Sequence, residues 1–257
     1  MKGLLGYSLL GLLAFLLSLL VLMPATVITT ALSARLSGFS AQTVEGRAAD
    51  GAMRGVRWRG MRVDRLVWRW QPLTLLGGGL EFGLNADAPE INVATSASVG
   101  LDRQLRLRDL NGRLPLARLG ALAGQPKLPL QGLVEFNLRE LRLNTTGDAA
   151  GLPISAEGVV YLRDLRAKLG QTLNLGDFTL SLTPAQPAGV HGVLKDNGGP
   201  LTLEGTLNLA PDGRYRFNGQ AALREAGNQP LRQAMSLLGP PGGDGRWALG
   251  FSGVLVR

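Results

Sequence analysis

Apolar and polar residues alternate with a period of two along most of the chain beyond residue 43, which is the pattern of strands with one buried face. The run 178–183, Phe-Thr-Leu-Ser-Leu-Thr, shows it clearly. Alternating strand and helix patterns are absent, so we predict a mainly β fold, a curved antiparallel sheet forming an open barrel or trough, over a doubly wound one. Leucines that would line its apolar face are Leu105, Leu107, Leu180, Leu182, Leu207 and Leu209.

Turn signals divide these runs into strands. Asp212-Gly213 lies between two alternating runs and predicts a hairpin turn, and a second Asp-Gly, Asp244-Gly245, precedes the last strand. Asn111-Gly112 and Asn197-Gly198 predict further turns. The Arg139-Glu140 step falls between two alternating runs and breaks their period, which predicts a bulge or bend.

Two segments instead show helical spacing. Residues 115–123 and 230–238 carry Leu or Met at intervals of three or four, begin with Pro and are followed by Gly. We expect one or two short helices here, covering an edge or open end of the sheet.

The start of the chain has a different character, because residues 3–34 contain no charged residue. A helix over residues 3–23 would be about 31 Å long, enough to cross the hydrocarbon of a bilayer. Lys2 is the positive flank, so we predict a cytoplasmic N-terminus, an anchor within residues 1–34 and an exported domain over residues 35–257. The anchor leucines include Leu4, Leu9, Leu13, Leu16 and Leu20.

A cleaved signal peptide is the alternative for this segment. Signal peptides normally have an apolar core of about 7–15 residues, which is shorter than the one here. In both interpretations the bulk of the chain lies outside the cytoplasm.

The amino-acid composition excludes several classes of metal site and catalytic site. The chain of 257 residues has no Cys and a single His, His191, which leaves no thiolate metal site, Cys nucleophile or His-rich centre. We therefore predict no cofactor, metal site or catalytic residue. A glycosidase-type carboxylate pair would have to come from residues such as Glu135, Glu140, Glu157 and Asp164, which we expect to point outward from strands.

The net charge of +8 comes largely from arginine. A positive net charge is compatible with binding to nucleic acid, anionic lipid or an acidic protein. The predicted export of the domain argues against nucleic acid as the partner. Residues 47–69 hold seven Arg and two Asp, with tryptophans interleaved. This region is either a lipid or partner interface, or a first strand with buried aromatics and solvated arginines. The candidate interface residues are Arg57, Trp58, Arg59, Arg62, Trp68 and Trp70.

An ordered set of short motifs resembles a known family. Asp50-Gly-Ala-Met-Arg-Gly55 is followed by a Trp-x-Pro-x-x-Leu-Leu-Gly segment at residues 70–77. Near the other end come Asp212-Gly-Arg-Tyr-Arg-Phe217, a Pro-Leu-x-x-x-x-x-Leu-Leu-Gly helix at residues 230–239, and Asp244-Gly-Arg. Together they are similar to the type II secretion system protein N family, also called general secretion pathway protein N. Met53 and Arg54 stand where many relatives carry an aromatic residue.

The resemblance implies an inner-membrane accessory component of the machine that exports folded proteins from the periplasm. Its expected partners are other secretion-system proteins, either the outer-membrane secretin or inner-membrane assembly components, together with membrane lipid. The family supplies no catalytic residue. The chain also resembles, more distantly, periplasmic lipid-transport proteins, so the alternative function is lipid binding or transfer in an apolar β groove.

Overall fold

The computed structural model describes residues 7, 11, 15, 18, 22–58, 60–72, 74, 79–100, 102, 104–122, 129–147, 150–225 and 227–255. These residues form one sheet of 13 antiparallel strands in which each strand pairs with the next along the chain. The strands are β1 (Thr43–Gly46), β2 (Asp50–Trp58), β3 (Met61–Trp70), β4 (Leu80–Ala88), β5 (Ile91–Val99), β6 (Gln104–Pro115), β7 (Leu130–Asn144), β8 (Pro153–Leu169), β9 (Gln171–Pro184), β10 (Val190–Asp196), β11 (Leu201–Leu209), β12 (Arg214–Leu223) and β13 (Trp247–Val254). The described helices are α2 (Thr26–Arg35), α3 (Leu116–Leu122) and α4 (Gln229–Ser236).

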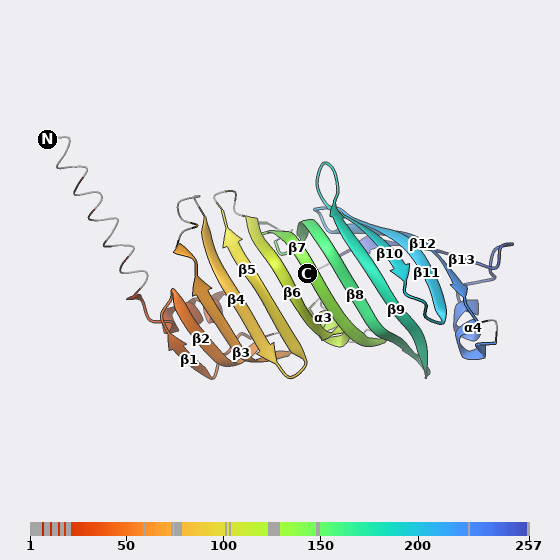
Figure 1. Cartoon of the computed structure of the whole chain (residues 1–257), viewed down its shortest axis with the longest axis horizontal. Coiled ribbons are helices and arrows are strands. Elements are labelled where there is room, and N and C mark those ends of the chain that lie inside the picture. The colour runs from red at the N-terminus through yellow and green to blue at the C-terminus, as the bar shows by residue number, and fades with distance from the viewer. Residues whose placement is uncertain are drawn as a thin grey trace.

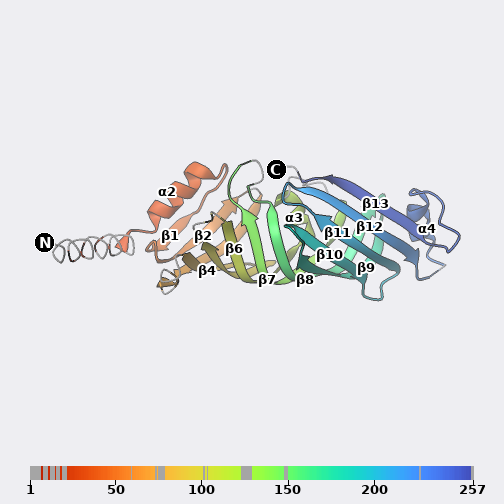
Figure 2. The same ribbon diagram turned by 90° about the horizontal axis from the view of Figure 1, so that it is seen from above.

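The sheet does not close on itself, because β1 and β13 are its two edges and do not pair with each other. Figure 1 shows the strands side by side along the long axis of the molecule. The view from above shows the sheet bent into a trough, with α2 lying over the strands at one end (Figure 2). The prediction of a mainly β chain with an open antiparallel sheet is therefore confirmed.

Single-residue bulges keep the apolar residues on the same face of the long central strands. In β7, Leu138 and Leu141 face the same side only because the register shifts between Leu138 and Glu140. Asp109 in β6 and Asp164 in β8 adopt positive φ values of 49° and 50°, a conformation that Asp tolerates better than most residues. Bulges increase local twist and bend the strand. The bulge predicted at Arg139-Glu140 is confirmed.

Glycines opposite aromatic rings make room on the inside of the bend. Gly205 and Gly219 face each other across β11 and β12, and the Phe217 ring lies over both. A Cβ atom on Gly205 would lie 2.5 Å from Cζ of Phe217. The ring thus takes the space that two side chains would otherwise fill, which lets large apolar groups fit a concave surface.

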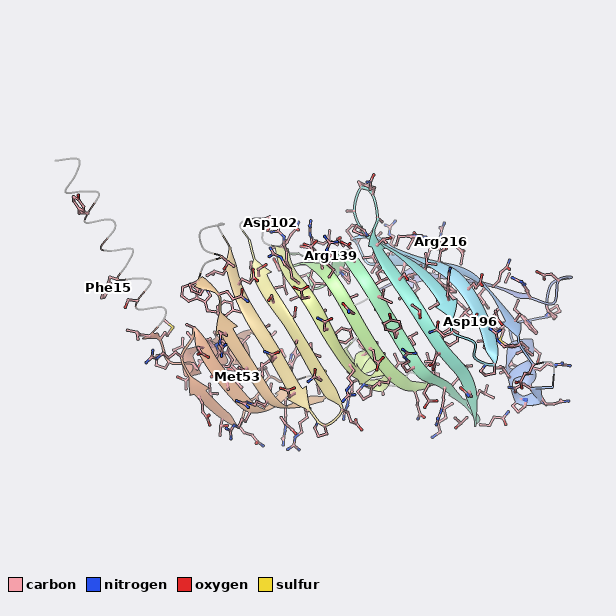
Figure 3. All side chains as sticks on the ribbon, viewed as in Figure 1. Phe15, Met53, Asp102, Arg139, Asp196 and Arg216 are labelled. Carbon is pink, nitrogen blue, oxygen red and sulfur yellow. The ribbon has the colours of Figure 1, made fainter. Side chains whose placement is uncertain are left out.

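Helices cover the apolar face at its two ends. Near the C-terminus, Leu231 and Met235 of α4 pack in a cluster with Phe178, which is 1% exposed. Asn228 begins this helix by accepting a hydrogen bond from the Leu231 backbone N–H through Oδ1, at 3.2 Å. At the other end, Ile28 of α2 packs against a cluster that contains Met53 (labelled in Figure 3), Val56 and Trp68.

Most turn and helix predictions agree with the structure. Turns lie at Asp212-Gly213, at Asp244-Gly245 and at Asn197-Gly198, and α3 and α4 occupy the two predicted helical segments. The turn expected at Asn111-Gly112 is wrong, because both residues lie inside β6. Gly112 is needed there for close packing, since a Cβ atom on it would lie 2.9 Å from the Phe136 ring.

The predicted anchor leucines, Leu4, Leu9, Leu13, Leu16 and Leu20, lie outside the described residues. Within the described part of the chain, no helix combines the length and hydropathy needed to cross a bilayer. Helix α2 packs against the sheet, and the neighbouring Ala25 is buried. The boundary between anchor and exported domain stays a prediction.

The glycine and aromatic pairing predicts that Gly205→Ala lowers the free energy of unfolding by about 1–3 kcal/mol, because the new methyl group overpacks against Phe217. Urea denaturation of the purified chain would measure the change. Gly250→Ala is the matched control, since a Cβ atom there meets nothing within 4 Å. Equal losses in the two variants would show that the Phe217 ring is not the cause of the loss.

Candidate functional site: an apolar concave face with one open edge

The six leucines predicted to line one face are brought together by the strand register. Leu105 and Leu107 of β6 lie opposite Leu143 and Leu141 of β7. Farther along the sheet, Leu180 lies opposite Leu194, while Leu182 and Leu207 flank Gly192 from either side, and Leu209 lies opposite Val190. These pairs share the face that carries α2 and α4 at its ends.

The middle of this face is only partly covered. Leu105, Leu107, Leu180 and Leu182 are half-buried and belong to neither helix-covered cluster. Val99 and Phe251 are 46% and 51% exposed. Because the sheet ladder already uses the backbone N–H and C=O groups of these strands, the face offers a ligand apolar contact and few hydrogen bonds.

A small apolar cavity of about 220 Å³ lies between α2 and the sheet. Ile28 and Met23 line one side of it, and Trp70, Leu80 and Phe82 lie on the other. The indole N–H of Trp70 is buried and has no hydrogen-bond acceptor among the described residues. The cavity walls are almost entirely apolar, so the cavity suits an apolar group.

The residues of the predicted arginine and tryptophan interface do not form one surface. Trp68 is 5% exposed, and its indole N–H donates to the Ala48 carbonyl oxygen at 3.0 Å. Arg57 and Arg62 are exposed and lie directly opposite each other on β2 and β3. Trp58 is half-buried, and Arg59 lies outside the described residues. Their role as a lipid or partner interface stays a prediction.

On the opposite face, the carboxylates singled out in the sequence each have an arginine partner. Arg142 forms two hydrogen bonds with Glu140, at 2.9 and 3.0 Å, and these bonds lower the pKa of Glu140 from its ordinary value. The other ion pairs are Glu135–Arg163, Glu157–Arg139 and Asp164–Arg166. His191 lies in β10, with Nδ1 2.8 Å from Oδ1 of Asn208. Among the described residues, no group of three His, Cys, Asp or Glu is placed to hold a metal.

The two edge strands of the sheet, β1 and β13, differ in how well they are protected from pairing with a strand of another chain. β1 has four residues, and short bridges at Pro24–Arg47 and Ser40–Arg57 lie beside it. β13 has eight residues, Trp-Ala-Leu-Gly-Phe-Ser-Gly-Val, with no charge and no Pro. Charges, Pro and short length are the usual means of blocking an edge, so β13 is the edge open to another strand. The sequence placed a last strand here but gave no sign that it would lie at an edge.

Comparison with known proteins places the chain among secretion components. The family model described as "Type II secretion system (T2SS), protein N" matches residues 37–250. A protein from Klebsiella pneumoniae named "Type II secretion system protein N" is 30% identical over 239 residues, which cover 88% of this chain and 86% of the relative. No solved structure matches the chain significantly.

Proposed function

The chain belongs to the type II secretion system protein N family, which gives it an accessory role in type II secretion. From this premise we propose that it is a non-enzymatic binding component, anchored in the inner membrane, whose sheet holds partners in the periplasm. The observation that carries the proposal is the long, uncharged and unpaired edge of β13. The ion pairs on the outer face support the proposal that the protein is not an enzyme. In them, arginines bind the carboxylates that could otherwise act as a catalytic acid and base.

For placement, we propose a single membrane span with a cytoplasmic N-terminus and a periplasmic domain over residues 35–257. The uncharged run of residues 3–34 and its positive flank at Lys2 support this topology.

The topology is testable with single cysteines, because the chain contains none. Asn137→Cys, on the exposed side of β7, is expected to react with a membrane-impermeant maleimide added to intact spheroplasts. Lys2→Cys is the control and is expected to react only after lysis. Labelling of Asn137→Cys only after lysis would contradict a periplasmic domain.

For partner binding, we propose that a strand of another secretion protein extends the sheet at β13. Strand addition uses main-chain hydrogen bonds for affinity and alternate side chains for specificity. The partner is proposed to be the outer-membrane secretin or an inner-membrane assembly component.

A photo-crosslinking amino acid at Ser252 in β13 is therefore expected to capture another secretion component in cells that assemble the machinery. The same probe at Asn137, on the central strand β7, is the control and should give little product, because both neighbouring edges of β7 are already paired. A second variant, Ser252→Pro, removes a backbone donor from β13 and should reduce capture by a probe at Gly250. Equal capture at positions 252 and 137 would argue against an edge-specific interface.

Lipid carriage is the second candidate function, and the half-covered apolar face favours it. Hydrocarbon chains require no hydrogen bonds, so they match a sheet face whose backbone groups are already paired. Each methylene removed from water stabilises such a complex by about 0.8 kcal/mol. The apolar cavity beside α2 adds a further site for hydrocarbon at this end of the sheet.

If the trough carries acyl chains, mass spectrometry of the gently purified chain should detect bound lipid, and Leu182→Asp should reduce it several-fold by placing a charge in apolar surroundings. Ser181→Asp is the matched control, because this neighbouring residue is exposed and points to the opposite face of β9. Lipid-free protein, or equal loss in both variants, would contradict carriage on this face.

A further inference from the structure

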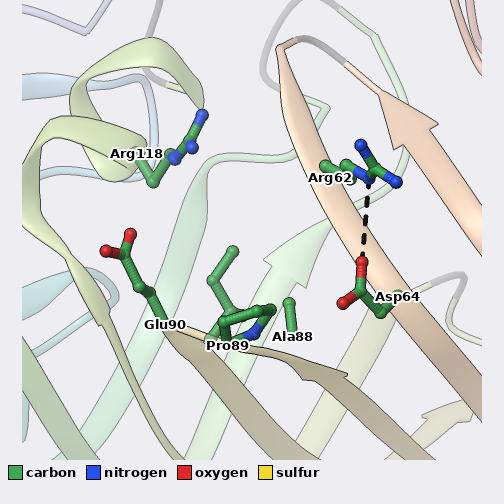
Figure 4. A pocket seen from close by; sticks show the side chains of 7 residues that line it. Arg62, Asp64, Ala88, Pro89, Glu90 and Arg118 are labelled. Carbon is green, nitrogen blue, oxygen red and sulfur yellow. Dashed lines mark ion pairs between the residues drawn. The ribbon is translucent and has the colours of Figure 1, made fainter.

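A pocket with charged side chains in its walls lies beside the apolar face, where β3 begins, β4 turns into β5 and α3 follows β6. Its volume is about 360 Å³, within the range of about 300–1,000 Å³ typical of small-molecule sites. Four charged side chains from three separate parts of the chain line it: Arg62, Asp64, Glu90 and Arg118. Figure 4 shows Arg118 and Glu90 on one side, Arg62 and Asp64 on the other, and Pro89 and Ala88 between them.

The charges in this pocket balance, and each side offers one of each sign. Arg62 Nε lies 3.7 Å from Asp64 Oδ1, and both side chains are more than half exposed. Arg118 donates to the Gly60 carbonyl oxygen at 3.1 Å and, among the described carboxylates, has no ion-pair partner. Glu90 likewise forms no ion pair with any described cation. Two of the four charged groups, Arg118 and Glu90, therefore have no ionic partner among the described residues and are available to a ligand.

The pocket joins the apolar face through its floor. Ala88 and Ile91 face each other across β4 and β5, and Ile91 is buried. In β4, Ala88 is in phase with Leu84 and Phe82, which pack in the N-terminal cluster. A ligand with a charged end in the pocket and an apolar tail along the sheet would match both surfaces.

We propose that this pocket binds the phosphoethanolamine headgroup of a phospholipid whose acyl chains lie on the concave face. The inference rests on the second candidate function, lipid carriage. A purely anionic headgroup would face two carboxylates, and a purely cationic one would face two guanidinium groups. A zwitterion places its phosphate against Arg62 and Arg118, whose forked donors suit phosphate, and its ammonium against Glu90 and Asp64.

The pocket also distinguishes between zwitterions. A primary ammonium donates hydrogen bonds to carboxylates, whereas a quaternary ammonium has no N–H and is typically held by aromatic rings. The described lining residues include no aromatic side chain. Phosphoethanolamine is therefore favoured over phosphocholine.

The test uses the full-length chain in detergent, exchanged against an equimolar mixture of phosphatidylethanolamine, phosphatidylglycerol and phosphatidylcholine with identical acyl chains. Native mass spectrometry is expected to show the ethanolamine lipid enriched about two- to fivefold over each of the others, the range for exposed ion pairs. Glu90→Gln leaves a net positive pocket and should shift the ratio toward the glycerol lipid. Arg62→Gln should lower retention of the ethanolamine lipid.

Matched controls change the same charges away from the pocket. Glu204→Gln and Arg216→Gln lie in β11 and β12 at exposed positions and should leave the lipid ratios unchanged. Equal carriage of the three lipids, or equal ratios in Glu90→Gln and Glu204→Gln, would overturn the headgroup pocket while leaving lipid carriage intact. Absence of all three lipids would overturn both. Binding of water-soluble glycerophosphoethanolamine, lost in Arg62→Gln, would support the pocket independently of the acyl chains.

Discussion

The structure depends on keeping apolar residues in phase across 13 consecutive strands. A slip of one residue in any pair would turn a strand's apolar side chains to the wrong face, because side chains alternate with a period of two. The strands β6, β7 and β8 are long enough to need corrections of register, among them those at Asp109, Arg139 and Asp164. The same bulges bend the sheet, so a continuous apolar face and a curved shape have a common cause.

An apolar face on this scale must be covered, and the described helices cover it only in part: α2 and α4 lie over its ends, and Leu116 of α3 packs against the C-terminal cluster. Helix α2 and helix α4 each bury a cluster of large side chains, while the leucines between the clusters remain half-exposed. Extended apolar patches of this kind usually mark sites of interaction. A bound lipid would cover the exposed part of this apolar face. A partner strand would instead pair with the open edge of β13.

Charge is arranged quite differently on the two faces. On the outer face, arginines pair with carboxylates across neighbouring strands, as Arg163 does with Glu135 and Asp177. Such exposed pairs contribute little stability individually, and they keep the outer surface soluble. The pocket beside α3 is different, because its four charges come from three separate parts of the chain and are only partly paired with one another.

The sequence by itself determined the strand class, most turns, the helices α3 and α4, the bulge at Arg139 and the family, because these depend on local periodicity, turn chemistry and short motifs. It also identified the leucines of the apolar face. Only the tertiary structure decided that Asn111-Gly112 continues a strand, that Trp68 enters a core, and that Arg62 and Arg118, 56 residues apart in sequence, line the same pocket. These outcomes depend on which strands become neighbours, and a pairing between distant segments leaves no periodic signal in either one.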